Sequence, residues 1–345
     1  MSKKDGLHSA IAFESLKAEI YLVYFGLDAE GKLGVTVSYT KRNIISVYYH
    51  MMYYRRKIIL ALMQLVGNTI DKITLQKLLL LFSKQQTNPV YDFVPYKFGC
   101  YSFTSNSDLS VMARKGILEE SEKSFARIDT KNYVDQLKPE DRALLSDIVL
   151  RYGKKSSKEL MYSTYVQYPY YARRSETAES LLSKDEYKIV RDSISKHDQT
   201  VLFTIGYEGI SLEEYLNRLI KNDVKLLVDV RRNPLSMKFG FSKSQLQKYC
   251  SYLGIEYFHL PEVGISSEQR QELNTQNDYD RLFELYRKEN LPKTVSTQNK
   301  IVELLTQYKR IALTCFEANI CQCHRKHLAD AIVKHPEFKY ELRHI

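Results

Sequence analysis

Residues 201–230 have the sequence VLFTIGYEGISLEEYLNRLIKNDVKLLVDV, and this stretch decides the fold. The apolar run over residues 201–206 ends at a glycine, which predicts a buried strand. Ser211 and Glu214 stand three residues apart, as in a capping box, before a helix with one apolar face. The apolar run over residues 225–230 predicts the next strand. A strand, a helix and a strand in this order are typical of a parallel sheet with right-handed crossovers.

The same alternation continues to the end of the chain. Further strands are expected over residues 256–260 and 310–315, and an edge strand over residues 339–343. Helices are expected over residues 242–254 and 324–333. The sequence therefore predicts that residues 200–345 form an α/β domain with a mostly parallel sheet.

The preceding part of the chain is patterned for helices instead. Apolar periodicity predicts helices over residues 55–66, from Thr74 to residue 82, and over residues 105–115, where Gly116 follows at the expected stop position. Two short strands are expected over residues 117–120 and 125–128. Three helices followed by a hairpin predict a mainly helical, winged-helix-like domain over residues 52–197. The alternative is a small helical domain without a wing.

Residues 1–51 fit neither half and are treated as an uncertain N-terminal extension. A helix over residues 10–24 and a strand over residues 33–39 are expected, without a clear third element to pack against. Because Met51 and Met52 immediately precede the patterned region, one hypothesis is that translation natively starts there.

Composition limits the possible functions. The 345 residues carry a net charge of +10, and residues 1–200 have 30 basic against 23 acidic side chains, while the rest has 21 against 18. This excess is compatible with DNA or RNA binding through residues 52–197. The 162–174 segment, with five tyrosines and two arginines, could stack bases or pack on the helical core.

No apolar run suits a membrane span, and the five cysteines do not resemble a disulfide framework, so a cytoplasmic protein is expected.

Polar side chains gather just after the expected strands. They are Tyr207, Glu208, Asp229, Arg231, Arg232, His259, Glu262, Cys315 and Glu317. In open α/β sheets, ligands bind at the carboxyl ends of the strands, so these residues are predicted to lie at one edge. Neither a Walker lysine motif nor a dinucleotide-binding glycine motif is present, and the sequence indicates no particular cofactor.

The same residues carry a family resemblance. The motifs are TIGYEG (204–209), VDVRRNP (228–234), GFSK (240–243), CFEA (315–318) and CHR (323–325). In this order they resemble the family called domain of unknown function 488, over residues 200–345. The resemblance implies a fold and a candidate site but no reaction, and Cys321 is extra to the usual pattern. The stretches KITLQKL (72–78), PYKFG (95–99) and YPYYA (168–172) are similar to N-terminal regions that accompany this domain in bacteria.

The last two motifs bring reactive groups together. Cys315 ends a strand and Cys323 opens a helix, whose dipole and neighbouring cations would favour a thiolate. Such a thiolate could act as a nucleophile, with Glu317 or His324 moving protons. Arg325 beside free helix N–H groups would suit an anion such as phosphate.

Other interpretations of these residues stay open. The spacing of Cys315, Cys321, Cys323, His324 and His327 could also bind zinc or iron, and the cysteines could simply be small buried apolar residues. The alternating Asp229 and Arg231 could form an ion pair that orients a ligand or that only supports the loop. The carboxylate of Glu208 could lie over the crevice.

These observations lead to a set of expectations. Cys315, Glu317, Cys323 and Glu208 are predicted as catalytic, and Tyr207, Asp229, Arg231 and Arg325 as substrate- or anion-binding; no residue is assigned as a metal ligand. We expect an enzyme directed at a nucleic acid or a nucleotide. The alternatives are a DNA-binding regulator whose α/β domain senses a small ligand, and a metal-binding protein. The oligomeric state does not follow from the sequence.

Overall fold

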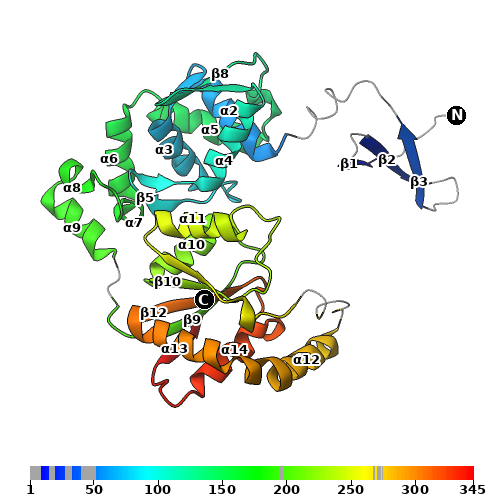
Figure 1. Cartoon of the computed structure of the whole chain (residues 1–345). Helices are drawn as coiled ribbons and strands as arrows, with labels where there is room; N and C mark the ends of the chain where they lie inside the picture. The colour runs from blue at the N-terminus through cyan, green and yellow to red at the C-terminus, as the bar shows by residue number, and fades with distance from the viewer. Residues whose placement is uncertain are drawn as a thin grey trace. The chain divides into compact units, whose positions relative to one another are not determined.

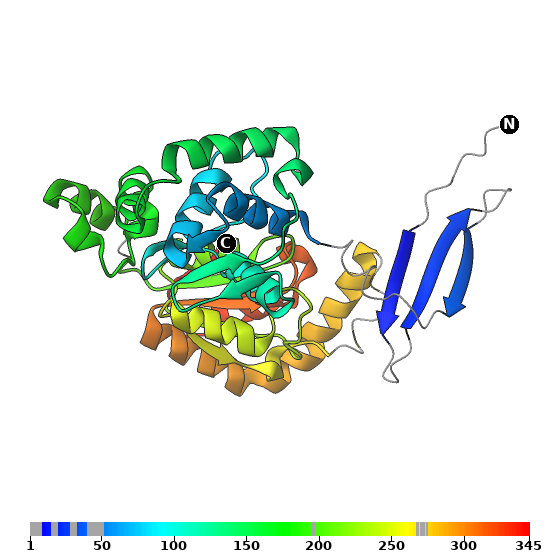
Figure 2. The ribbon, with the colours of Figure 1, turned by 90° about the horizontal axis from the view of Figure 1, so that it is seen from above.

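The computed structural model describes the backbone of residues 9–14, 20–27 and 33–39, and it describes residues 52–194, 197–266, 269, 273 and 275–345 with their side chains. Contacts divide the chain into two units, Met1–Tyr54 and Arg55–Ile345. The first contains β1 (Ser9–Glu14), β2 (Ile20–Leu27) and β3 (Leu33–Tyr39), an antiparallel sheet in chain order (Figure 2). The strand expected over residues 33–39 is confirmed. The helix expected over residues 10–24 is wrong, because β2 is rich in β-branched and aromatic residues and pairs on both sides.

The C-terminal half is built on five parallel strands. They are β9 (Val201–Gly206), β10 (Leu226–Asp229), β11 (Glu256–His259), β12 (Arg310–Cys315) and β13 (Glu341–His344). The strand order is β11-β10-β12-β9-β13, with every neighbouring pair parallel. The predicted α/β fold is confirmed. Because β12 lies between β10 and β9, the residues that follow these three strands meet at one edge.

Helices cover both faces of this sheet (Figure 1). On one face lie α10 (Leu212–Lys221) and α11 (Lys243–Tyr252), packed on side chains such as Phe203. On the other lie α13 (Val295–Tyr308) and α14 (His324–Val333), packed on alternate side chains such as Leu202. The helix α12 (Gln276–Leu285) precedes α13. None of the helices in the described ranges is both long enough and apolar enough to cross a membrane.

Residues 52–194 are mainly helical. In chain order the elements are α2 (Tyr54–Leu65), β4 (Thr69–Asp71), α3 (Lys72–Ser83), β5 (Val94–Tyr96), β6 (Gly99–Tyr101), α4 (Phe103–Arg114), β7 (Leu118–Glu120), β8 (Ser124–Arg127), α5 (Pro139–Tyr152), α6 (Ser157–Gln167), α7 (Pro169–Ala172), α8 (Ala178–Leu181) and α9 (Lys184–Asp192). The three expected helices and the hairpin are present, and β4 joins the hairpin in a sheet of order β4-β8-β7. The helix expected to open at Thr74 begins earlier, because the Asp71 carboxylate accepts the N–H groups of Ile73 and Thr74.

The two halves of the Arg55–Ile345 unit share apolar contacts. Phe103, at the start of α4, packs against Tyr249 of α11 with ring centroids 4.7 Å apart. Val94 and Phe103 belong to the same buried cluster as the apolar residues of α10 and α11. In the 162–174 segment, Tyr165 and Tyr171 are buried, while Tyr162 is exposed.

Candidate functional site

The sheet positions the candidate site through strand register. Asp229 on β10 pairs with Thr314 on β12, and Cys315 on β12 pairs with Gly206 on β9. The loops that follow these strands are hydrogen-bonded together, because the backbone N–H groups of Tyr207 and Glu208 both donate to the Phe316 carbonyl. The residues predicted to lie at one edge therefore follow strand ends that are adjacent in the sheet.

Asp229 and Arg231 form the predicted ion pair. The Asp229 carboxylate is fully buried and accepts hydrogen bonds from Nε and Nη2 of Arg231 at 2.8 and 2.5 Å. It also accepts from the Tyr257 hydroxyl at 2.6 Å. Burial alone would lower the pKa of Arg231, but hydrogen bonding and the charge of Asp229 hold this pKa above its ordinary value. Asp229 therefore anchors Arg231 in the wall of the site.

Arg231 in turn positions Tyr207. Its Nη1 donates to the Tyr207 hydroxyl at 2.8 Å and to the Phe241 carbonyl at 2.9 Å. The Tyr207 ring stacks on Phe241 with centroids 4.2 Å apart. Burial raises the pKa of Tyr207, so the hydroxyl stays protonated at neutral pH.

An open cleft of about 320 Å³ lies at this edge of the sheet. Its lining residues are Tyr207, Arg231, Arg232, Asn233, Leu235, Ser236, Met237, Ile265, Cys315 and Phe316. Three of the predicted site residues, Tyr207, Arg231 and Cys315, thus meet in one cleft. Asn233 and Ser236 were not predicted as site residues, although Asn233 belongs to the VDVRRNP motif and both lie in the loop after β10.

Behind Cys315 lies a cluster of ionisable side chains. The Cys315 thiol donates to the Glu317 carboxylate at 3.1 Å, and its Sγ lies 3.6 Å from Nδ1 of His324. Ligand-type atoms of Cys315, Cys323 and His324 all lie within 4.8 Å of one another, and all three residues are buried. We refer to Cys315, Glu317, Cys323 and His324 as the Cys315 cluster.

The prediction that the helix dipole and neighbouring cations keep Cys323 as a thiolate is wrong. Although Cys323 occupies the N-cap position of α14, burial and a hydrogen bond with Cys315 raise the pKa of its thiol well above the ordinary value. Desolvation therefore outweighs the helix dipole, and this thiol is protonated at neutral pH.

Glu208 and Arg325 support the loop rather than line the cleft. The exposed Glu208 carboxylate accepts the N–H of Ala318 at 2.9 Å. Arg325 is buried and donates to the carbonyls of Glu317 and Ala318 at 2.5 and 3.3 Å. Both side chains thus fix the segment that carries Glu317.

Two residues of the metal-like spacing lie apart from the Cys315 cluster. Cys321 is exposed, whereas the other four cysteines are buried, and all five are free thiols. His327 contacts the Phe283 ring and accepts from Arg287 at 3.2 Å. Of the five candidate ligands in the sequence, the structure groups three.

Comparison with known proteins finds a family match in the C-terminal half of the chain. No curated protein matches the chain. A family model does match, and its range extends from the capping residue of α10 to α14, so it includes the Cys315 cluster. Residues 211–332, in the C-terminal half of the chain, thus belong to the family described as domain of unknown function DUF488.

Proposed function

We propose that the chain is an enzyme that acts on a phosphate-bearing, nucleotide-like ligand in the cleft at the carboxyl edge of its sheet. The observation that carries this proposal is the position of Cys315, which both lines the cleft and belongs to the Cys315 cluster. A ligand in the cleft would contact Cys315, and the Cys315 thiol contacts Glu317 and His324, which can accept or hold a proton.

The lining of the cleft supports this class of ligand. Arg232 is exposed, and no acidic side chain of the described residues forms an ion pair with it. A guanidinium with free donors suits phosphate, and Asn233 and Ser236 add amide and hydroxyl groups. Three exposed apolar side chains flank these donors: Leu235, Met237 and Phe316. They offer the surface on which a base or a sugar could pack.

Binding is the first test. With the full chain, affinity for a fluorescent nucleoside monophosphate is measured by anisotropy for the unmodified protein and for Arg232→Ala. Loss of a charged hydrogen bond is expected to weaken binding about tenfold or more. Lys288→Ala, which removes a cation from an exposed helix pair with Glu284, serves as the matched control and should bind normally. Equal affinity of both variants, or no binding at all, contradicts the proposal.

Turnover is the second test, on a panel of phosphomonoesters and phosphodiesters. Cys315→Ser is expected to reduce the rate about a hundredfold or more, because it replaces the thiol that lies between the cleft and the other side chains of the Cys315 cluster. Cys321→Ser should leave the rate unchanged, since this thiol is exposed and outside the cluster. Full activity of Cys315→Ser would show that the Cys315 cluster takes no part in the reaction.

Nucleic acid binding by residues 52–197 is a second proposal. The order α2, β4, α3, β5, β6, α4, β7, β8 supports it, since apart from the inserted β5-β6 hairpin this is the helix-strand-helix-helix-strand-strand order of a winged helix. In helix-turn-helix proteins the first residues of the recognition helix reach the bases. Here the start of α4 is hydrogen-bonded to Glu213, and the hairpin carries Glu119, Glu120 and Glu122, which repel phosphate. We therefore place the phosphate contacts elsewhere, on the exposed lysines that follow α5 and open α6: Lys154, Lys155 and Lys158.

The test is the salt dependence of DNA and RNA binding by the full chain. The full chain is needed because Phe103 and Val94 pack in the core of the α/β half. Alanine at the three lysines should lower the slope of log affinity against log salt by about one for each phosphate contact. The double variant Lys288→Ala/Lys300→Ala is the control. Negligible binding at low salt would end this proposal.

A further inference from the structure

The side chains of the Cys315 cluster are arranged as metal ligands. Two thiols and one imidazole meet within 4.8 Å at buried positions, at the end of β12 and the start of α14. Soft sulfur and imidazole donors suit zinc and related transition metals and do not suit magnesium or calcium. We infer that Cys315, Cys323 and His324 bind a divalent metal ion of the zinc type, with Glu317 beside it.

The orientation of His324 supports this inference. Its Nε2 lies 3.1 Å from the Val230 carbonyl, which can only accept a hydrogen bond. Nε2 must therefore carry the proton, and in the neutral ring the lone pair of Nδ1 is directed toward the Cys315 sulfur. A histidine that donates one ring N–H to a backbone carbonyl and offers the other nitrogen is the usual arrangement of a metal ligand.

The distances fit a tetrahedral ion. With metal–sulfur and metal–nitrogen bonds of about 2.3 and 2.0 Å, two ligands of a tetrahedron are about 3.5 Å apart. Sγ of Cys315 lies 3.6 Å from Nδ1 of His324, and Oε2 of Glu317 lies 3.1 Å from the same sulfur. The pair of Cys315 and His324 thus already has the tetrahedral separation, and the ligand atom of Cys323 lies within 4.8 Å of both.

The site resembles a catalytic centre more than a structural one. Structural zinc is bound by four Cys and His ligands, whereas catalytic zinc has three protein ligands and one open position. Here Cys, Cys and His supply three ligands, and Cys315 also lines the cleft. The inference deepens the proposed function and, for its catalytic part, rests on it: a metal ion at this place would polarise a ligand in the cleft.

The decisive measurement is metal content, which needs no substrate. Untagged full chain purified from zinc-supplemented cells should contain zinc in equimolar amount by mass spectrometry. Exchange with cobalt should produce the visible bands of a tetrahedral ion and a thiolate-to-cobalt charge-transfer band. His324→Ala and Cys323→Ser should abolish both signals, while Cys321→Ser and Cys250→Ser, which change thiols outside the cluster, should retain them.

A second measurement covers variants that fail to fold. In the unmodified chain, a zinc-binding dye should detect release of the ion when a mercurial blocks the thiols. A metal-free protein, or one whose metal survives in a folded His324→Ala variant, overturns the inference. A chain that contains metal but binds no nucleotide contradicts the proposed function alone, whereas an active chain without metal contradicts this inference alone.

Discussion

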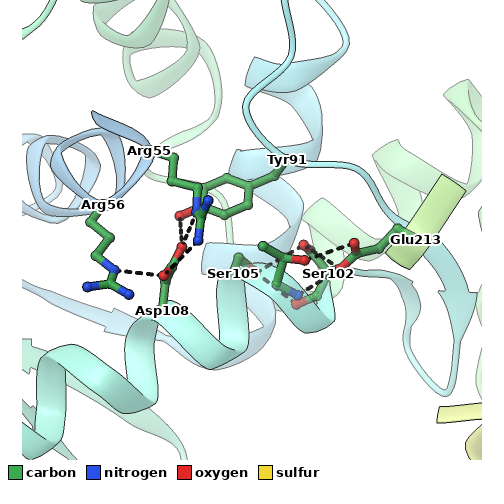
Figure 3. A network of polar contacts seen from close by, with 8 residues as sticks. Arg55, Arg56, Tyr91, Ser102, Ser105, Asp108 and Glu213 are labelled. Carbon is green, nitrogen blue, oxygen red and sulfur yellow. Dashed lines mark hydrogen bonds and ion pairs between the residues drawn. The ribbon is translucent and has the colours of Figure 1, made fainter. Parts of the chain in front are cut away.

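Glu213 and Thr104 are 109 residues apart in the sequence, yet the Glu213 carboxylate accepts the backbone N–H and the hydroxyl of Thr104 at 2.7 and 2.9 Å. It also accepts the Ser102 hydroxyl at 3.2 Å, and Figure 3 shows Glu213 directed at the start of α4. This carboxylate is fully buried. One side chain of the α/β half thus satisfies polar groups in the first turn of a helix of the other half.

Glu213→Ala should destabilise the chain strongly. The substitution leaves one buried and two partly buried donors without their acceptor and should lower the free energy of unfolding by about 3 kcal/mol. Glu213→Gln keeps an acceptor oxygen and should stay within about 1 kcal/mol of the unmodified chain. Urea denaturation measures both. Glu214→Gln, on the exposed side of the same helix turn, is the control, and an equally large loss there would contradict the assignment.

The same carboxyl predicts a pH dependence. Burial raises the pKa of Glu213 above 4.5, and the hydrogen bonds from Thr104 and Ser102 only partly oppose this. Because the folded-state pKa is raised, the contribution to stability is complete below the unfolded pKa and is lost as pH rises through the folded one. Glu213→Gln should therefore remove part of the fall in stability above pH 4.5. Identical pH profiles of the two proteins would show that this carboxyl does not titrate differently on folding.

Asp229→Asn should be far more harmful than removal of a surface charge. Arg231 would remain buried without its counterion, which costs about 3–5 kcal/mol. Glu284→Gln breaks the exposed pair with Lys288 and should cost less than about 1 kcal/mol. Chemical denaturation compares the two variants. If both variants lose only a little stability, the ion pair of Asp229 with Arg231 contributes little to the stability of the cleft wall.

Much of the α/β half could be predicted because its signals are local. The apolar runs at β9 and β12 have the bounds expected from sequence, since strands buried on both faces need continuous apolar residues. Their parallel order then brought Tyr207, Arg231 and Cys315 to one cleft. The position of a residue just after a strand was enough to find these three.

The direction of individual side chains could not be predicted in the same way. The guanidinium of Arg325 is a group that commonly binds anions, but here it donates to the loop carbonyls of Glu317 and Ala318. No sequence pattern singled out Glu213, because its partners are more than a hundred residues away. The prediction of a thiolate at Cys323 was wrong for the same reason. Burial raises the pKa of this thiol, and burial depends on packing that the spacing of residues in the sequence does not show.

Gly206→Ala should disrupt the Cys315 cluster without unfolding the sheet. A Cβ at this position would lie 2.0 Å from the Glu317 carbonyl oxygen and 3.0 Å from Nη2 of Arg325, so the loop after β12 must shift. We expect lower metal content and turnover together with a cooperative thermal transition. Gly254→Ala, where the nearest atom lies 3.9 Å away but φ is +61°, adds backbone strain without this clash. If Gly254→Ala reduces metal content and turnover as much, the effect of Gly206→Ala is not specific to the loop.

His327 should titrate at an unusually low pH. Burial, followed by the charges of Arg287 and Lys326, lowers its pKa from 6.5 to about 4. Because the folded-state pKa of this base is lowered, its contribution to stability is complete above pH 6.5 and is lost as pH falls toward 4. Imidazole signals followed by NMR should show one ring that stays neutral down to this range, and His327→Gln should remove that signal and reduce the loss of stability in acid. A ring at position 327 that protonates near pH 6.5 would show that its contact with Arg287 and Phe283 is open in solution.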